Sequence, residues 1–171
     1  MPRIALTLMF ALLGLLPAAV SAADGEVPMA RHLDQVADQA ARKQVPILLV
    51  FAAQGCGYCK KLDAEILRPM LLSGDYTDKV IVRKVMIDDQ GELTGLDGVK
   101  TTGAALAAHY GINMTPTMVL VDPHGQELVK RIRGLGVIDY FGAEVDTAID
   151  NARNQLRTVA ISAAPRPAAA L

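Results

Sequence analysis

Apolar residues in the first half of the chain follow two different spacings. Residues 29–44 carry apolar side chains every three to four positions, at Leu33, Val36, Ala37, Ala40 and Ala41. Acidic residues come early in this stretch and basic residues late, as the helix dipole favours, so the pattern predicts an amphipathic helix. Residues 46–53, "PILLVFAA", form a continuous apolar run. Such a run is typical of a central strand that is buried on both faces.

The same argument extends along the rest of the chain. Helical spacing after residue 59 continues to Leu72, with Pro69 as the expected kink and Ser73-Gly74 as the stop. The further predicted elements are strand 79–87, a glycine-rich loop over 88–99, helix 101–110, strands 116–122 and 127–134, and a last helix from residue 138. The two late strands flank a turn containing Gly125 and should pair antiparallel. This order predicts an α/β fold with a mixed central sheet and helices on both faces.

The two ends of the chain differ from this middle part. Residues 1–23 combine Arg3, an apolar run and small residues up to Ala23, which predicts a secretory signal peptide. An uncleaved anchor is the alternative, because residues 4–23 are about as long as a spanning helix. Residues 24–158 are expected to form one domain and residues 159–171 a disordered tail rich in alanine and proline.

Charge changes this picture little. The chain has 17 Lys and Arg against 18 Asp and Glu, and losing Arg3 with the leader would leave a net charge of −2. Such a balance suggests neither nucleic acid nor an anionic membrane surface as a partner.

The leader predicts a periplasmic protein. No segment of the mature chain is typical of a dimerisation element, so a monomer is expected.

The chemistry centres on the chain's two cysteines, Cys56 and Cys59, in "QGCGYCKK". A structural zinc site needs four ligands, and three scattered histidines (His32, His109 and His124) do not complete one, so no metal is expected. A permanent disulfide is a second interpretation. Closing so short a loop would stabilise the fold only slightly on the loop-length model.

The third interpretation is a redox-active pair. A strand that feeds a helix at Cys56 places its sulfur among unpaired backbone N–H groups at the positive end of the helix dipole. Cysteines in such positions have pKa values of roughly 3.5 to 7.5, against about 8.5 for a free cysteine. Cys56 is therefore the predicted nucleophile. Cys59, about one helical turn on, is the predicted resolving cysteine, and no bound cofactor is required.

Four motifs in order resemble the thioredoxin superfamily: "PILLVF" before the cysteines, "CGYCK" opening a helix, "MTPT" starting a strand, and "RGLG" after the hairpin. The resemblance covers residues 29–152. "CGYC" and Thr115-Pro116 are similar to the catalytic domain of periplasmic disulfide isomerases of the DsbC type, although the separate dimerisation domain of those isomerases is missing. The leader, the single domain and the long loop after the second strand are similar to periplasmic thioredoxin-like proteins of the SoxW kind.

The resemblance implies roles for further residues. Pro116 would be a cis-proline facing the disulfide, and Thr115 would expose backbone groups that pair with an extended client segment. A trans-proline at the first position of a strand is the alternative. Gly134 would leave room for the client, or would simply end a strand. Tyr58 would line the client surface and influence the redox potential.

The implied function is an extracytoplasmic thiol–disulfide oxidoreductase that reduces or isomerises protein disulfides. A membrane electron carrier of the DsbD type would keep it reduced, whereas a quinone-linked oxidase would serve an oxidant. The alternative is a non-catalytic chaperone or assembly factor of thioredoxin fold, which would bind unfolded segments. Direction of electron flow and client identity are not encoded in the spacing of the cysteines.

Two positions depart from the family pattern. Cytosolic thioredoxins have a tryptophan directly before the first cysteine and a buried aspartate six residues before it, where this chain has Gly55 and Val50. The buried proton acceptor for the resolving cysteine is therefore missing. Asp63 would replace it only if its side chain pointed inward.

Overall fold

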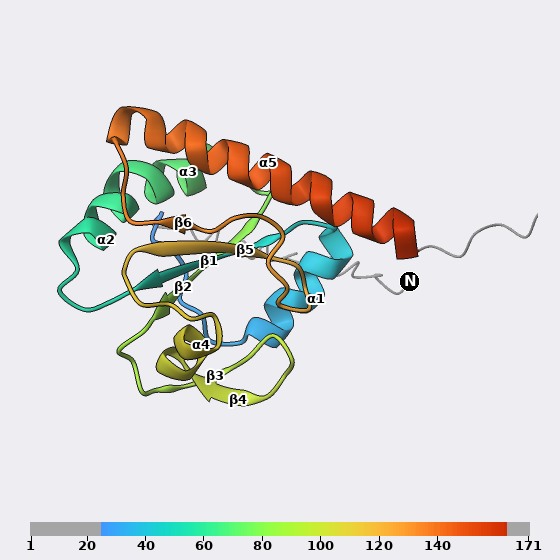
Figure 1. Cartoon of the computed structure of the whole chain (residues 1–171), viewed down its shortest axis with the longest axis horizontal. Helices are drawn as coiled ribbons and strands as arrows, with labels where there is room; N and C mark the ends of the chain where they lie inside the picture. The colour runs from blue at the N-terminus through green and yellow to red at the C-terminus, as the bar shows by residue number, and fades with distance from the viewer. Residues whose placement is uncertain (1–24, 164–171) are drawn as a thin grey trace, which may run out of the picture.

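The computed structural model describes residues 25–163, and only the backbone of 160–163. Its elements follow in the order shown in Figure 1: α1 (Leu33–Lys43), β1 (Ile47–Ala52), α2 (Gly57–Leu62), the π-helical turn η1 (Asp63–Leu67), α3 (Arg68–Ser73), β2 (Ile81–Met86), β3 (Glu92–Thr94), β4 (Lys100–Thr102), α4 (Gly103–His109), β5 (Thr117–Val121), β6 (Ile132–Arg133) and α5 (Ile138–Ala163).

The main sheet has the strand order β2-β1-β5-β6. β1 pairs parallel with β2 and antiparallel with β5, and β5 pairs antiparallel with β6. All six residues of β1 are buried, as its continuous apolar run predicts. The mixed sheet and the antiparallel hairpin expected from the sequence are thus confirmed.

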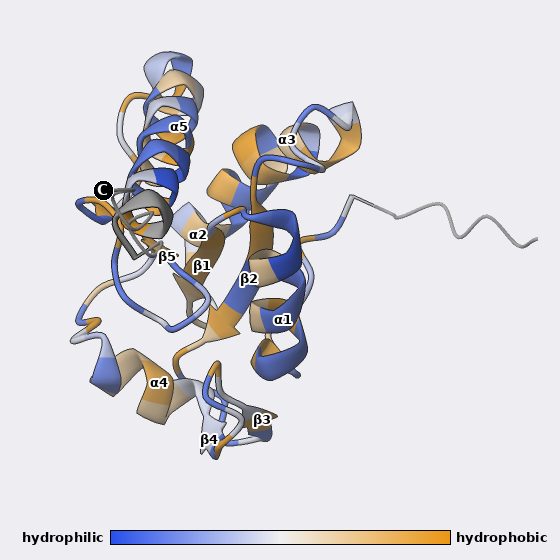
Figure 2. Ribbon diagram, turned by 90° about the vertical axis from the view of Figure 1, so that its right-hand side faces the viewer, coloured by the Kyte–Doolittle hydropathy of each residue, from blue (hydrophilic) through white to orange (hydrophobic). Residues whose placement is uncertain are grey.

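Helices cover both faces of this sheet. α3 and α5 lie on one side, and α4 with the β3–β4 hairpin lies on the other (Figures 1 and 2). Side chains of β1 alternate between two cores: Leu48 and Val50 pack with α5, whereas Leu49 and Phe51 pack with α1 and α4. The helical spacing of apolar residues from residue 138 is reflected in α5, which contributes four buried side chains to the core: Phe141, Val145, Ile149 and Ala152.

The first helix begins later than predicted. α1 starts at Leu33 rather than at Met29, because residues 28–30 are extended and pair with β2. The Lys84 N–H donates to the Pro28 carbonyl (2.8 Å), and the Ala30 N–H donates to the Lys84 carbonyl (2.8 Å). This segment covers the backbone edge that β2 would otherwise expose.

The predicted kink lies just before Pro69. Residues Asp63–Leu67 form one π-helical turn, in which the Arg68 N–H donates to the Asp63 carbonyl, five residues back. Pro69 then stands in the first turn of α3, where its missing N–H costs little. The predicted stop is confirmed, since α3 ends with Gly74 in the left-handed conformation (φ 77°).

Two predictions for loops and strands were wrong in extent. The expected loop over 88–99 contains β3, which pairs antiparallel with β4. The expected strand 127–134 shrinks to β6, because residues 129–131 bulge out of the ladder. The Leu128 N–H still donates to the Leu120 carbonyl (2.9 Å), and the ladder resumes only where Ile132 pairs with Met118. Residues 129–131 therefore lie opposite the single residue Val119, which leaves two extra residues on the bulged side.

The C-terminal end of the described residues differs from expectation. α5 runs to Ala163, so the helix continues past residue 159, where the disordered tail was predicted to start. The predicted signal peptide (1–23) and the rest of the predicted tail (164–171) lie outside the described residues. Between residues 25 and 163, no helix combines the length and the apolar character needed to cross a membrane.

Candidate active site

The cysteine pair lies where β1 delivers the chain to α2. After Ala52 the backbone leaves the sheet, and Gly55 takes a positive φ (71°) that a residue with a Cβ rarely adopts. Cys56 is the N-cap of α2, and its N–H donates to the Ala53 carbonyl (3.3 Å). A buried strand and a tight loop therefore place this cysteine at the positive end of a helix.

Cys56 and Cys59 form a disulfide, with their Cα atoms 5.3 Å apart. The Cys59 N–H donates to the Cys56 Sγ (3.1 Å), which satisfies one of the unpaired N–H groups of the helix start. Cys56 is half-buried, whereas Cys59 is only 5% exposed. An incoming sulfur can thus approach Cys56 more easily than Cys59, as the assigned roles require.

The loop before β5 faces this disulfide. The Thr115 hydroxyl donates to the Cys56 Sγ across 3.5 Å. The Thr115–Pro116 peptide bond is cis. The structure therefore brings together Cys56 and Thr115, which are 59 residues apart in the sequence.

Gly134 follows β6, which pairs with β5 on the side opposite β1. Its N–H donates to the Pro116 carbonyl (2.7 Å), and its φ is 74°. A Cβ at this position would lie 3.8 Å from the Met114 Cε, which is ordinary contact, so the positive φ is the stronger reason for glycine here.

Large apolar side chains around these segments are exposed. Tyr58 between the cysteines is 67% exposed, and Met114 before the cis peptide bond is 45% exposed. Val137 and Tyr140, which follow Gly134 in the chain, are 68% and 76% exposed. Large exposed apolar side chains around a disulfide are typical of a surface that contacts a partner.

Val50, at the position of the missing buried acid, is 1% exposed and lies opposite Lys84 in the β1–β2 ladder. The Lys84 ammonium forms an ion pair with Asp63, and the two side chains are 12% and 29% exposed. Asp63 is thus engaged by a lysine of the sheet. Sequence analysis missed Lys84, although the two-residue alternation of β2 places it on the same face as the buried Val82.

Asp88 is a second residue that the sequence did not reveal as part of the site. Its carboxylate accepts a hydrogen bond from the Gln54 N–H (2.7 Å), two residues before Cys56. The expectation of a plain loop over 88–99 gave no reason to single it out.

The chain that leads to Thr115 is anchored at Tyr110, the C-cap of α4. Its hydroxyl donates to the Gly125 carbonyl (2.9 Å), and its carbonyl accepts from the Arg131 guanidinium (2.6 Å). Burial, followed by the charges of Glu127 and Asp122, raises the pKa of Tyr110 to about 12. The phenol therefore remains a neutral donor at ordinary pH.

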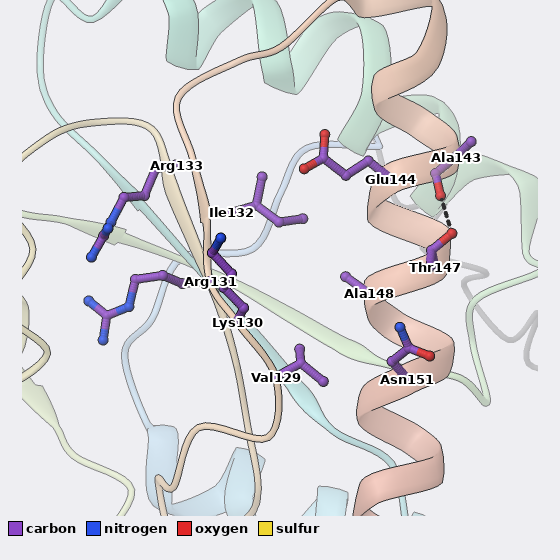
Figure 3. A pocket seen from close by; sticks show the side chains of 10 residues that line it. All are labelled: Val129, Lys130, Arg131, Ile132, Arg133, Ala143, Glu144, Thr147, Ala148 and Asn151. Carbon is purple, nitrogen blue, oxygen red and sulfur yellow. Dashed lines mark hydrogen bonds between the residues drawn. The ribbon is translucent and has the colours of Figure 1, made fainter.

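A groove of about 730 Å³ lies between the bulged segment and α5. Figure 3 shows that the Arg131 and Arg133 side chains point away from α5, while small side chains such as Ala143 and Ala148 line the helix side. Neither cysteine lines this groove. Its basic bulge is better explained as protection of an edge strand against pairing with other chains.

Metal binding has no support in the described part of the chain. There, histidine, cysteine and acidic side chains form no group of three or more that could hold a metal ion. The redox group available at this site is the disulfide itself.

The family model for the thioredoxin-like domain matches residues 33–149. The chain therefore belongs to the thioredoxin-like family, as its motifs predict. It is a thioredoxin-fold protein with a CxxC pair, which is consistent with a thiol–disulfide oxidoreductase. No curated protein matches the chain in sequence.

One of the similar solved structures has a TM-score above 0.5 and supports the fold. A structure described as DsbH oxidoreductase is 18% identical and has a TM-score of 0.53, and the match covers 82% of this chain and 93% of that one. The periplasmic thioredoxin SoxS from Paracoccus pantotrophus is 26% identical over 63% of this chain and 98% of its own, with a TM-score of 0.44. A thioredoxin-fold protein from Helicobacter pylori is 19% identical over 71% and 91%, with a TM-score of 0.45.

Proposed function

We propose that this protein is a periplasmic thiol–disulfide oxidoreductase that reduces or isomerises disulfides in client proteins. The observation that carries the proposal is the disulfide at the start of α2, with an accessible Cys56 and a buried Cys59. A permanent disulfide needs no accessible sulfur beside exposed apolar side chains. Tyr58 and Met114 give this site a surface on which an extended apolar client segment can bind.

The reaction starts from the reduced pair. The Cys56 thiolate attacks one sulfur of a client disulfide, which forms a mixed disulfide and releases one client thiolate that takes up a proton. Cys59 then loses its proton and attacks the Cys56 Sγ. This forms the internal disulfide and releases the second client thiol. Two electrons pass to the client, and a membrane dithiol carrier of the DsbD type would restore them.

Isomerisation needs the mixed disulfide to persist. Another client thiol must attack it before Cys59 does, after which Cys56 is regenerated without net electron transfer. Val50 stands at the position of the family's buried acid and cannot accept a proton, and Asp63 is paired with Lys84. Slow deprotonation of Cys59 would lengthen the life of the mixed disulfide, and this favours isomerisation over simple reduction.

The test is to trap the mixed disulfide. The reduced C59S variant, mixed with ribonuclease A whose disulfides have been scrambled, should accumulate a covalent complex that a reducing agent dissolves. The matched C56S variant, which keeps one cysteine of the pair, should form little of it. Equal trapping by both variants would contradict the assigned roles, and no trapping by either would contradict oxidoreductase activity on proteins.

Wild-type protein in the same assay separates the two activities. Recovery of ribonuclease activity without added oxidant would indicate isomerisation, whereas accumulation of free ribonuclease thiols would indicate reduction. A variant without both cysteines that still prevents aggregation of unfolded clients would instead support a chaperone.

A further inference from the structure

The parallel ladder between β1 and β2 ends just before the cysteine loop. Its last backbone bond runs from the Ile87 N–H to the Ala52 carbonyl (2.8 Å). A regular parallel ladder would continue with a bond from the Gln54 N–H to the carbonyl of Ile87, the residue after β2. Here the Gln54 N–H donates to the Asp88 carboxylate instead (2.7 Å). A side chain thus extends the ladder into the loop that carries Cys56.

Asp88 is itself held in a well-defined turn. The Asp89 N–H donates to the Met86 carbonyl (3.2 Å), which closes the turn at the end of β2. Gly103, at the start of α4, lies so close that a Cβ there would be 2.1 Å from the Met86 oxygen. Asp88 is exposed, but its backbone is held by the turn on one side and by the packing of Gly103 against Met86 on the other.

Few other contacts hold the loop. In the described residues, its other backbone bond before α2 runs from the Cys56 N–H to the Ala53 carbonyl (3.3 Å). The disulfide ties Cys56 down in the oxidised protein. Once the disulfide is reduced, that tether is lost, while the hydrogen bond from the Gln54 N–H to the Asp88 carboxylate still links the loop to the segment that follows β2.

We propose that Asp88 is a positioning residue of the redox site, which holds Gln54 and through it keeps Cys56 facing Thr115 in the reduced protein. This inference rests on the proposed function. The hydrogen bond of Asp88 goes to the Gln54 N–H and not to a sulfur. Its effect is therefore on the geometry of attack and not on the bonds that form and break.

The first test does not depend on any redox activity. Hydrogen exchange at the Gln54 amide is measured by NMR in the reduced protein and in three variants. D88A should exchange at least about tenfold faster than wild type, because a hydrogen bond to a charged acceptor is lost. D88N, whose amide oxygen can still accept, should exchange nearer the wild-type rate.

The matched control is D97A. Asp97 also accepts a hydrogen bond from a backbone N–H, that of Val99 (3.0 Å), but in the hairpin between β3 and β4. This variant should leave exchange at Gln54 unchanged. Equal protection of Gln54 in D88A and wild type would overturn the proposal.

The second test separates positioning from reactivity. Alkylation of the Cys56 thiolate by iodoacetamide needs no docked partner, whereas attack on a peptide disulfide needs a correctly placed sulfur. D88A should slow attack on the peptide about tenfold with little change in the alkylation rate at high pH, and D88N should restore most of the loss. D88A and D88N both remove the charge, so a D88N as slow as D88A would overturn the role of the hydrogen bond.

The proposed function and the positioning role of Asp88 can be refuted independently. A wild-type protein that attacks no peptide disulfide would refute the proposed function. The Gln54 amide would then still decide whether Asp88 holds the loop.

Discussion

Replacing Thr115 by valine tests how the site favours the reduced state. The Thr115 hydroxyl donates to the Cys56 Sγ across 3.5 Å, and valine has nearly the same shape without the donor. A disulfide sulfur is a weak acceptor, but a thiolate carries a full charge. The hydroxyl should therefore stabilise the reduced protein more than the oxidised protein.

The magnitude follows from the acceptor of this contact. Hydrogen bonds to charged groups contribute about 1.5 to 3 kcal/mol, and sulfur is a weaker acceptor than oxygen, so we take about 1.4 kcal/mol for the Thr115 hydroxyl. For a two-electron couple this corresponds to about 30 mV. Because T115V loses a contact that favours the reduced state, its reduction potential should fall by about 30 mV. The pKa of the Cys56 thiol should rise by about one unit for the same reason.

Two assays check these values. Equilibration in glutathione buffers with a count of free thiols gives the potential, and the pH profile of alkylation gives the thiol pKa. Thr147→Val is the matched control, since the Thr147 hydroxyl donates to the Ala143 carbonyl (2.8 Å) on α5, away from the cysteines. An unchanged or higher potential in T115V, or an equal shift in the control, would refute the reasoning.

Two further predictions concern stability. Gly103→Ala should lower the free energy of unfolding by about 1 to 3 kcal/mol in urea, because its Cβ would meet the Met86 carbonyl oxygen at 2.1 Å; Gly142→Ala, whose Cβ has only an ordinary contact at 3.9 Å, should not destabilise. Tyr110→Phe should remove an alkaline loss of stability. The pKa of Tyr110 is about 12 in the folded protein and about 10 in the unfolded chain. Its contribution to the free energy of unfolding is therefore complete below pH 10, and about 2 to 3 kcal/mol of it is lost as the pH rises from 10 to 12. Parallel wild-type and variant curves over that range would contradict this.

Much of the fold could be predicted because its signals are local. The apolar run of β1, the helical spacing of α5 and the position of the cysteines at a strand–helix junction each lie within a short window of sequence. The limits of β6 could not be predicted from such windows. Whether residues 129–131 bulge depends on the partner strand, which sequence spacing does not describe.

The same distinction applies to the site. Cys56 and Cys59 are evident from their spacing, and Thr115, Pro116 and Gly134 came from a resemblance. Lys84 and Asp88 were missed because their roles arise only when β2 is placed beside β1. A lysine in a strand and an aspartate in a glycine-rich loop are usually solvated. The alternation along β2 was the available signal for Lys84, and nothing near Asp88 in the sequence indicates its role.

The reduction potential of the Cys56–Cys59 pair tests the central claim most directly. The protein is equilibrated in buffers of defined potential, and its free thiols are counted at each potential. We expect a reversible two-electron transition between about −180 and −270 mV, the range from disulfide isomerases to thioredoxins. A value near −120 mV would make the protein an oxidant. A disulfide that resists reduction below about −300 mV would be a structural link, and either result would contradict the proposed function.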